Sequence, residues 1–233
     1  MPRQNFTEIV VVLDKSPSME VIRTGTIAGM NAFIKEQQDT PGDGCWTLIQ
    51  FDGPHSYAVT YQAIPQEKVL PFTEATYRPG GSGTALIDAV CRAIHETSSR
   101  LAGLKEEDYP SGVLFVIMTD GEENSSRTYT RDDMNKLIAD HKEKYRWQFA
   151  FLGANQDAVA EARKYGTGAA GAMNYAYNNA GAEAVLRCAS AGAKKMREEL
   201  TSGNLMASFG IEAAPDDKLI SKQAILPGDE KKS

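Results

Sequence analysis

The chain has 233 residues, of which 42% are hydrophobic and 24% are charged, and its formal net charge is −6. This composition is typical of a globular protein, and the length suits one large domain better than two small ones. The acidic balance, without a basic stripe along the sequence, argues against general nucleic-acid binding. No apolar run approaches the ~18 residues of a membrane span, so we expect neither nucleic acid nor a membrane as a partner.

The cysteines indicate a reducing compartment. Cys45, Cys91 and Cys188 are odd in number and scattered, with no CxxC pair among them. This usage is typical of reduced core residues rather than of disulfides or metal ligands. No hydrophobic stretch precedes the first predicted strand. The sequence therefore predicts a cytoplasmic protein.

The first third of the chain predicts a strand, a helix and a hairpin. An apolar, β-branched run at Ile9–Leu13 indicates a strand that is buried on both faces. Apolar residues then recur three and four apart over a helix at Val21–Gln38. Strands follow at Cys45–Phe51 and Tyr57–Ile64, and the short turn at 52–54 between them permits only antiparallel pairing. We expect this hairpin at one edge of the sheet.

The rest of the chain alternates between apolar strands and helical patterns. A glycine-rich loop ends at Thr84, at or just before a helix that runs to about Leu101. Thr130 and Asp133 form a capping box for one of the later helices. The further predicted elements are a helical turn within Gln66–Phe72, strands at Gly112–Thr119, Trp147–Leu152 and within Ala172–Tyr177, and helices at 131–144, Gln156–Lys164 and Ala182–Leu200.

Strand–helix alternation predicts an α/β fold of the doubly wound, Rossmann-like type. We expect a mostly parallel sheet of about six strands, with one antiparallel edge strand and helices on both faces. Right-handed crossovers place the strand that ends at Asp14 beside the strand that ends at Asp120, near the middle of the sheet. Residues 1–202 form the predicted domain, and residues 203–233 form a C-terminal tail that is partly disordered.

Oxygen-bearing side chains come from three separate segments. Asp14, Ser16 and Ser18 follow the first strand, Thr84 ends the glycine-rich loop, and Asp120 follows the strand at Gly112–Thr119. Ligands of open α/β sheets bind beyond the carboxyl ends of the strands, so we expect all five side chains at one edge. Carboxylates and hydroxyls, without sulfur or imidazole, are the ligands of a hard divalent cation such as Mg2+.

These motifs resemble the von Willebrand factor A domain. The resemblance rests on Asp14-x-Ser16-x-Ser18, on the glycine-rich loop that bears Thr84, and on Thr119-Asp120-Gly121, and it covers about residues 6–200. It implies a small, stand-alone domain of the bacterial or phage type with a metal-ion-dependent adhesion site. Ser16, Ser18 and Thr84 would be direct or near-direct ligands of Mg2+, with Mn2+ or Ca2+ as alternatives. Asp14 and Asp120 would bind directly or through water, and an Asp or Glu of a partner protein would complete the shell.

Two residues depart from the common pattern within the first motif. The Lys15 ammonium either sits near the metal or points to solvent, and Pro17 fixes its φ near −65° and stiffens the loop. Outside the motif, Asp52 is predicted to be a turn residue. We expect Glu122 and Glu123 to be solvated loop charges.

The leading functional hypothesis is a binding module that recognises a partner protein through a metal-bridged carboxylate, without catalysis. One alternative is a Mg2+-dependent phosphoryl-transfer enzyme or hydrolase. Such enzymes usually carry a second carboxylate two residues after the first, where this chain has Ser16, and no GxxxxGK[ST] phosphate loop is present. Another alternative is a structural or assembly protein whose metal only braces loops. The partner and the oligomeric state are left open.

Overall fold

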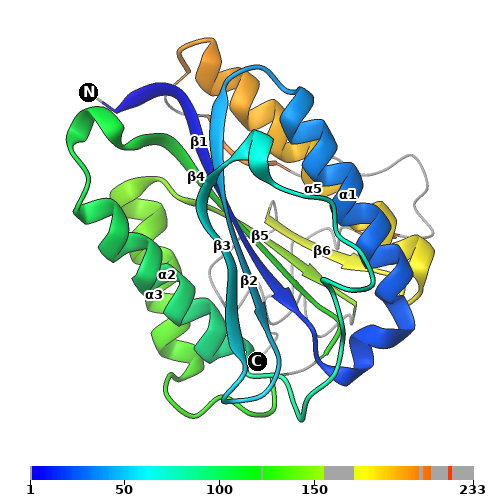
Figure 1. Ribbon diagram of the computed structural model, residues 1–233. Coiled ribbons are helices and arrows are strands. Elements are labelled where there is room, and N and C mark those ends of the chain that lie inside the picture. The colour runs from blue at the N-terminus through cyan, green and yellow to red at the C-terminus, as the bar shows by residue number, and fades with distance from the viewer. Residues whose placement is uncertain (1, 122, 155–170, 205–206, 211–219, 222–233) are drawn as a thin grey trace, which may run out of the picture.

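The structure is a computed structural model, and it describes residues 2–121, 123–154, 171–204, 207–210 and 220–221. A central twisted sheet lies between two layers of helices, as Figure 1 shows. Within the described residues, no helix has the length and apolar character needed to cross a membrane.

The sheet confirms the predicted fold class. Its six main strands are parallel except for the antiparallel strand at one edge, which forms the predicted hairpin with its neighbour. A two-residue strand that the sequence did not predict adds antiparallel pairing at the opposite edge. The strand order is β3-β2-β1-β4-β5-β6-β7, with bounds β1 Arg3–Asp14, β2 Asp43–Phe51, β3 Tyr57–Pro65, β4 Pro110–Thr119, β5 Gln148–Gly153, β6 Ala172–Tyr175 and β7 Ile220–Ser221.

The strand β1 is the centre of the sheet and pairs in parallel with β2 and β4. Its side chains alternate between two cores: Val11 and Leu13 pack on one side, and Val10 and Val12 pack on the other. Burial on both faces explains why the run is continuously apolar. The parallel register places Leu13 opposite Met118, so β1 and β4 end side by side as predicted.

Helices cover both faces of the sheet, with α1 and α5 on one side and α2 and α3 on the other (Figure 1). The predicted helix at Val21–Gln38 begins differently, because Pro17 opens a separate 3-10 helix ahead of it. The predicted helix at Gln156–Lys164 lies outside the described residues. The bounds are η1 Pro17–Ile22, α1 Arg23–Asp39, η2 Gln66–Lys68, α2 Leu86–Ala102, η3 Glu106–Asp108, α3 Arg131–Tyr145 and α5 Asn179–Thr201.

Side-chain caps fix the starts of two helices. The Thr130 hydroxyl accepts from the Asp133 N–H, and the Asp133 carboxylate accepts from the Thr130 N–H, which confirms the predicted capping box of α3. The Asn178 side chain accepts from the Gly181 N–H. This cap satisfies a free N–H of the first turn, and it explains why α5 begins three residues before the predicted start.

The three cysteines form no disulfide, and two of them belong to the core. Cys45 and Cys91 are buried, and burial raises the pKa of each thiol to about 12. A thiol with such a pKa is uncharged at neutral pH and is a weak nucleophile. These two residues therefore contribute packing, as the sequence predicted.

Described residues beyond Ser202 contact the domain. Phe209 is buried in the core between the sheet and α5, and its N–H donates to Gln148 Oε1 at 3.3 Å. Ile220–Ser221 pair with β6. The division of the chain at residue 202 and the disorder of its end stay predictions.

The helices α1 and α5 approach closely where α1 carries glycine. A Cβ at Gly25 would lie 2.0 Å from the Asn179 carbonyl oxygen, and a Cβ at Gly29 would lie 2.8 Å from Leu186 Cβ. Farther along, the buried Arg197 guanidinium donates to the carbonyls of Gln37 at 2.7 Å and Gly42 at 2.8 Å. The two helices are thus joined by close packing near their starts and by charge-assisted hydrogen bonds near their ends.

We predict that Gly25→Ala lowers the free energy of unfolding by about 2 kcal/mol. Replacing glycine by alanine in a helix normally gains about 1 kcal/mol, but overpacking against fixed backbone costs more, about 1–3 kcal/mol or above. Urea unfolding of both proteins measures the difference. Gly103→Ala is the control, because a Cβ there meets its nearest atom at 3.5 Å. Equal stability of Gly25→Ala and wild type would contradict this account of the contact.

Candidate metal centre

The carboxyl ends of β1 and β4 bring the predicted site residues together. Asp14 is the last residue of β1, and Asp120 follows β4. Ser18 Oγ donates to Asp120 Oδ1 at 2.9 Å, and it lies 3.2 Å from Ser16 Oγ. The side chains that follow the two strands are therefore in direct contact, although about a hundred residues separate them in the sequence.

Thr84 reaches the same place from the glycine-rich loop, two residues before α2. Gly121 follows Asp120 and has no side chain. A Cβ at Gly121 would lie 3.6 Å from Thr84 Oγ1 and 3.8 Å from Ser18 Oγ. Both hydroxyls thus face one point of the Asp120 loop, and all five predicted residues lie at one edge of the sheet.

Asp14 is fully buried and anchored by two hydrogen bonds. Its Oδ1 accepts from the Ser16 N–H at 2.7 Å, and its Oδ2 accepts from the Thr119 hydroxyl at 2.6 Å. Burial raises the pKa of Asp14 to about 6, and the charge of Asp120 adds to this, against the lowering effect of the Thr119 and Ser16 hydrogen bonds. The ionised carboxylate is therefore costly here unless a cation compensates it.

Asp120 lies in a similar environment and is 6% exposed. Burial raises the pKa of its carboxyl, although hydrogen bonds from the hydroxyls of Ser18 and Tyr177 lower it in part. Two buried carboxylates with raised pKa values thus lie at the ends of neighbouring strands. A divalent cation between them would favour the ionised form of both.

Thr84 is positioned by Asn124, a residue that the sequence analysis missed. The Thr84 N–H donates to Asn124 Oδ1 at 2.9 Å, and the Asn124 N–H donates to the Thr84 carbonyl at 3.1 Å. This pair of bonds joins the glycine-rich loop to the loop that carries Asp120. The only signal in the sequence is an amide residue four positions after Asp120, which does not identify its partner.

The same two segments are joined by carboxylates. Glu123 accepts from the N–H of Ile87 at 2.9 Å in the first turn of α2, and from two N–H groups of its own loop. Asp88 of α2 accepts in return from N–H groups of residues 127–129. The expectation that Glu123 is a solvated loop charge is therefore wrong, because it caps α2. Glu122 lies outside the described residues.

Lys15 does not point toward the two carboxylates of the site. Its ammonium forms an ion pair with Asp52, which also accepts from the Ser56 hydroxyl and from the Gly53 N–H at 2.5 Å. Burial acts to raise the pKa of Asp52, but the bonds from Lys15, Ser56 and Gly53 bring it below its usual value. Asp52 is the turn residue that the sequence predicted, with an added role as the partner of Lys15.

The site is open on the side of Ser18. This residue is exposed, whereas Asp14, Ser16, Thr84 and Asp120 are buried. The Tyr177 hydroxyl donates to the Ser18 carbonyl at 2.7 Å, and the Tyr177 side chain is 43% exposed. A group that binds an ion at this site would therefore approach it from the side of Ser18, next to the Tyr177 ring.

The donor set fits a hard cation. Within the part of the chain that the structure describes, no three His, Cys, Asp or Glu side chains gather where they could hold an ion. The candidate site has only two carboxylates, and its other three side-chain oxygens are hydroxyls. Mg2+ typically binds one or two carboxylates and keeps several waters, so these five residues suit Mg2+ better than a metal that needs many anionic ligands.

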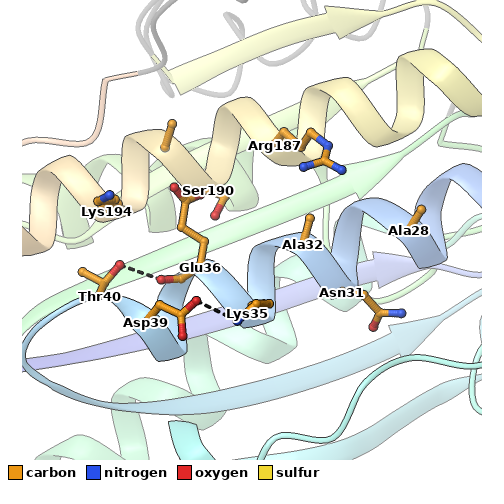
Figure 2. Close-up of a pocket in the computed structure, with 11 residues that line it drawn as sticks. Ala28, Asn31, Ala32, Lys35, Glu36, Asp39, Thr40, Arg187, Ser190 and Lys194 are labelled. Carbon is orange, nitrogen blue, oxygen red and sulfur yellow. Dashed lines mark hydrogen bonds and ion pairs between the residues drawn. The ribbon is translucent and has the colours of Figure 1, made fainter.

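A separate pocket of about 820 Å³ lies between α1 and α5, away from this edge of the sheet (Figure 2). Its rim carries Lys35 and Arg187, which already pair with Asp39 and Glu183. Alanines from both helices contribute to its lining, but most of its lining residues are polar or charged. The pocket has no convergent set of ligands comparable to that around Asp14.

No protein-family model and no curated protein sequence matches the chain. Several solved structures are similar in fold. Proximal thread matrix protein 1 from the mussel byssus has a TM-score of 0.56 at 17% identity, over 78% of this chain and 46% of that one. A von Willebrand factor type A protein from Catenulispora acidiphila has a TM-score of 0.55 at 16% identity, over 81% and 42%. The pilus adhesin SpaC from Lactobacillus rhamnosus GG has a TM-score of 0.57 at 13% identity, over 81% and 30%.

The chain spans less than half the length of each of these three proteins. Sequence identity at this level bears on the fold alone. The strand order, the two helical layers and the similarity to the Catenulispora protein agree with one another. The chain therefore has the fold of a von Willebrand factor A domain.

Proposed function

We propose that the protein is a metal-ion-dependent binding module, in which Asp14, Ser16, Ser18, Thr84 and Asp120 hold Mg2+. The observation that carries this proposal is the convergence of three segments on one point. Ser18 contacts Asp120, and both Ser18 Oγ and Thr84 Oγ1 lie within 4 Å of the Cβ position of Gly121. The five side chains offer only oxygen donors, and Ser18 is the exposed member of the set.

The bound ion would supply a positive centre that attracts a carboxylate. Because Mg2+ typically binds only one or two carboxylates and fills its remaining positions with neutral ligands and water, an incoming Asp or Glu would bind by replacing a water. Such a group would enter over Ser18, since the other four ligands are buried. Tyr177 and the exposed Val21, which follows Ser18 by one turn of the 3-10 helix, would contact the residues around it.

Two further features support a binding module rather than an enzyme. The Lys15 ammonium, which a phosphoryl-transfer site would direct at a phosphate, is paired with Asp52. One of the structures with the same fold is a pilus adhesin, and so a binding protein. We extend binding to this chain as a proposal, because a fold does not by itself imply a function.

The remaining expectations are part of the same proposal. Residues 1–202 form the proposed binding domain, and the protein acts in the cytoplasm, where its cysteines stay reduced. The partner is a protein with an accessible Asp or Glu. Mg2+ is the proposed ion, and Mn2+ or Ca2+ would be alternatives at the same ligands.

We predict that Mg2+ stabilises the protein and that Asp14→Asn abolishes this effect. Free Mg2+ at about 100 times its Kd adds about 2.7 kcal/mol to the free energy of unfolding, and EDTA reverses the gain. The variant keeps its fold, because the asparagine oxygen still accepts from the Ser16 N–H and the asparagine NH2 group can donate to Thr119 Oγ1. The Thr119 hydroxyl then donates to the Gly121 carbonyl instead. Thermal unfolding with and without Mg2+ measures both proteins. Asp39→Asn, at an exposed acid of α1, is the control that responds like wild type.

We also predict how the metal-free protein depends on pH. The pKa of Asp14 is about 6 in the folded protein against an ordinary 3.8, so protonated Asp14 favours the folded state. Its contribution is complete below about pH 4 and is lost as the pH rises through 6. In EDTA at pH 7.5, Asp14→Asn is therefore more stable than wild type by up to roughly 3 kcal/mol. If Asp14→Asn and wild type are equally stable in EDTA at pH 7.5, or if Mg2+ does not stabilise wild type, the argument for the site fails.

Peptide selection tests the proposed partner chemistry. We predict that random peptides captured by the protein in Mg2+ and released by EDTA share an Asp or Glu. Replacing that residue by Asn or Gln abolishes binding, and Asp14→Asn captures none of these peptides. Peptides without a common acid, or full retention in EDTA, would show that binding does not use a metal-bridged carboxylate.

A further inference from the structure

Lys15 lies between two proposed ligands in the sequence, but its charge is directed away from them. The ammonium pairs with Asp52, which follows β2, and only 22% of the Lys15 side chain and 6% of the Asp52 side chain are exposed. The Lys15 N–H donates to the Phe51 carbonyl at 2.8 Å. The ends of β1 and β2 are therefore joined by a backbone bond and by a largely buried ion pair.

The glycine-rich loop is fastened to both members of this pair. The Gly80 N–H donates to the Lys15 carbonyl at 2.7 Å, and the Ala85 N–H donates to the Asp52 carbonyl at 2.7 Å. These bonds hold the loop just before and just after the segment that ends in Thr84. The position of Thr84 thus depends on how Lys15 and Asp52 sit relative to each other.

The loop also wraps over the Asp52 carboxylate. Gly81 has φ +92, and a Cβ there would lie 2.3 Å from Asp52 Oδ1. Only glycine combines this backbone conformation with such a close approach. The Ser56 hydroxyl and the Gly53 N–H donate to the same carboxylate, so Asp52 is held by its own turn as well as by Lys15.

We infer that the Lys15–Asp52 ion pair is a clasp that positions Thr84, and thereby sets the affinity of the site for its cation. Lys15 and Asp52 are positioning residues, because they act on the ion through the loop and do not touch it. This inference rests on the proposed metal site. It explains why a lysine is tolerated between Asp14 and Ser16, since Asp52 neutralises a charge that would otherwise repel the ion.

Charge repulsion and positioning make opposite predictions for one variant. If Lys15 only repels the cation, Lys15→Met strengthens Mg2+ binding. If the ion pair positions Thr84, Lys15→Met weakens it, because the loop loses one of its supports. Groups that orient metal ligands from outside typically change metal affinity by about 10–100-fold.

Calorimetric titration with Mg2+ is the first test. We expect Lys15→Met to weaken binding about tenfold, Asp52→Asn to weaken it more because the ammonium is left unpaired, and Lys15→Arg to stay within about threefold of wild type. Lys35→Met is the matched control, since it removes an exposed lysine from an ion pair on α1. Ser56→Ala removes one hydrogen bond to Asp52, and we expect it to weaken Mg2+ binding by an intermediate amount. It replaces Asp52→Asn in the test if that variant does not fold.

Amide hydrogen exchange in EDTA is the second test and needs no metal. The amides of Gly80 and Ala85 exchange faster in Lys15→Met than in wild type, and Lys15→Arg restores their protection. The inference is overturned if the Gly80 and Ala85 amides exchange at the same rate in Lys15→Met and wild type. It is also overturned if Lys15→Met binds Mg2+ at least as tightly as wild type. If wild type itself binds no Mg2+, the proposed metal site fails, and exchange at Gly80 and Ala85 still decides whether the ion pair positions the loop.

Discussion

The burial of two carboxylates at the ends of β1 and β4 is the constraint on which the site depends. Asp14 and Asp120 are removed from water, and the pKa of each is raised above its ordinary value. Such groups are tolerated only when hydrogen bonds or a cation compensate them. Thr119 and Ser16 bond to Asp14, and Ser18 bonds to Asp120. These bonds hold both carboxylates at the edge of the sheet where an ion is proposed.

The loops around this point are held to each other as well as to the sheet. Asn124 joins the Thr84 loop to the Asp120 loop, and Glu123 caps the helix that follows Thr84. The Lys15–Asp52 pair joins the ends of β1 and β2. Each link pairs groups that would otherwise need water, so the links stabilise the loops while they orient the ligands. The protein's own hydrogen bonds and ion pairs therefore set most of the geometry of the proposed site.

Much of the fold could be predicted because its signals are local. Burial on both faces makes β1 continuously apolar, and the short turn after β2 enforces the antiparallel hairpin with β3. The capping box of α3 lies within four residues. The handedness of crossovers limits the possible strand orders, and the parallel pairing of β1 with β4 confirms that the strands that lead to Asp14 and Asp120 are neighbours.

Only the tertiary structure decided how the loops meet. Glu123 reads as a surface charge, yet it caps a helix that begins 37 residues earlier. Lys15 and Asp52 are also 37 residues apart, and the sequence around either residue does not identify the other as its partner. Pairings of this kind depend on which loops the sheet brings to one edge and on the polar groups left unsatisfied there. The sequence by itself therefore determined most of the elements and the kinds of side chain at the proposed site, and the packing of the loops determined how these side chains are arranged.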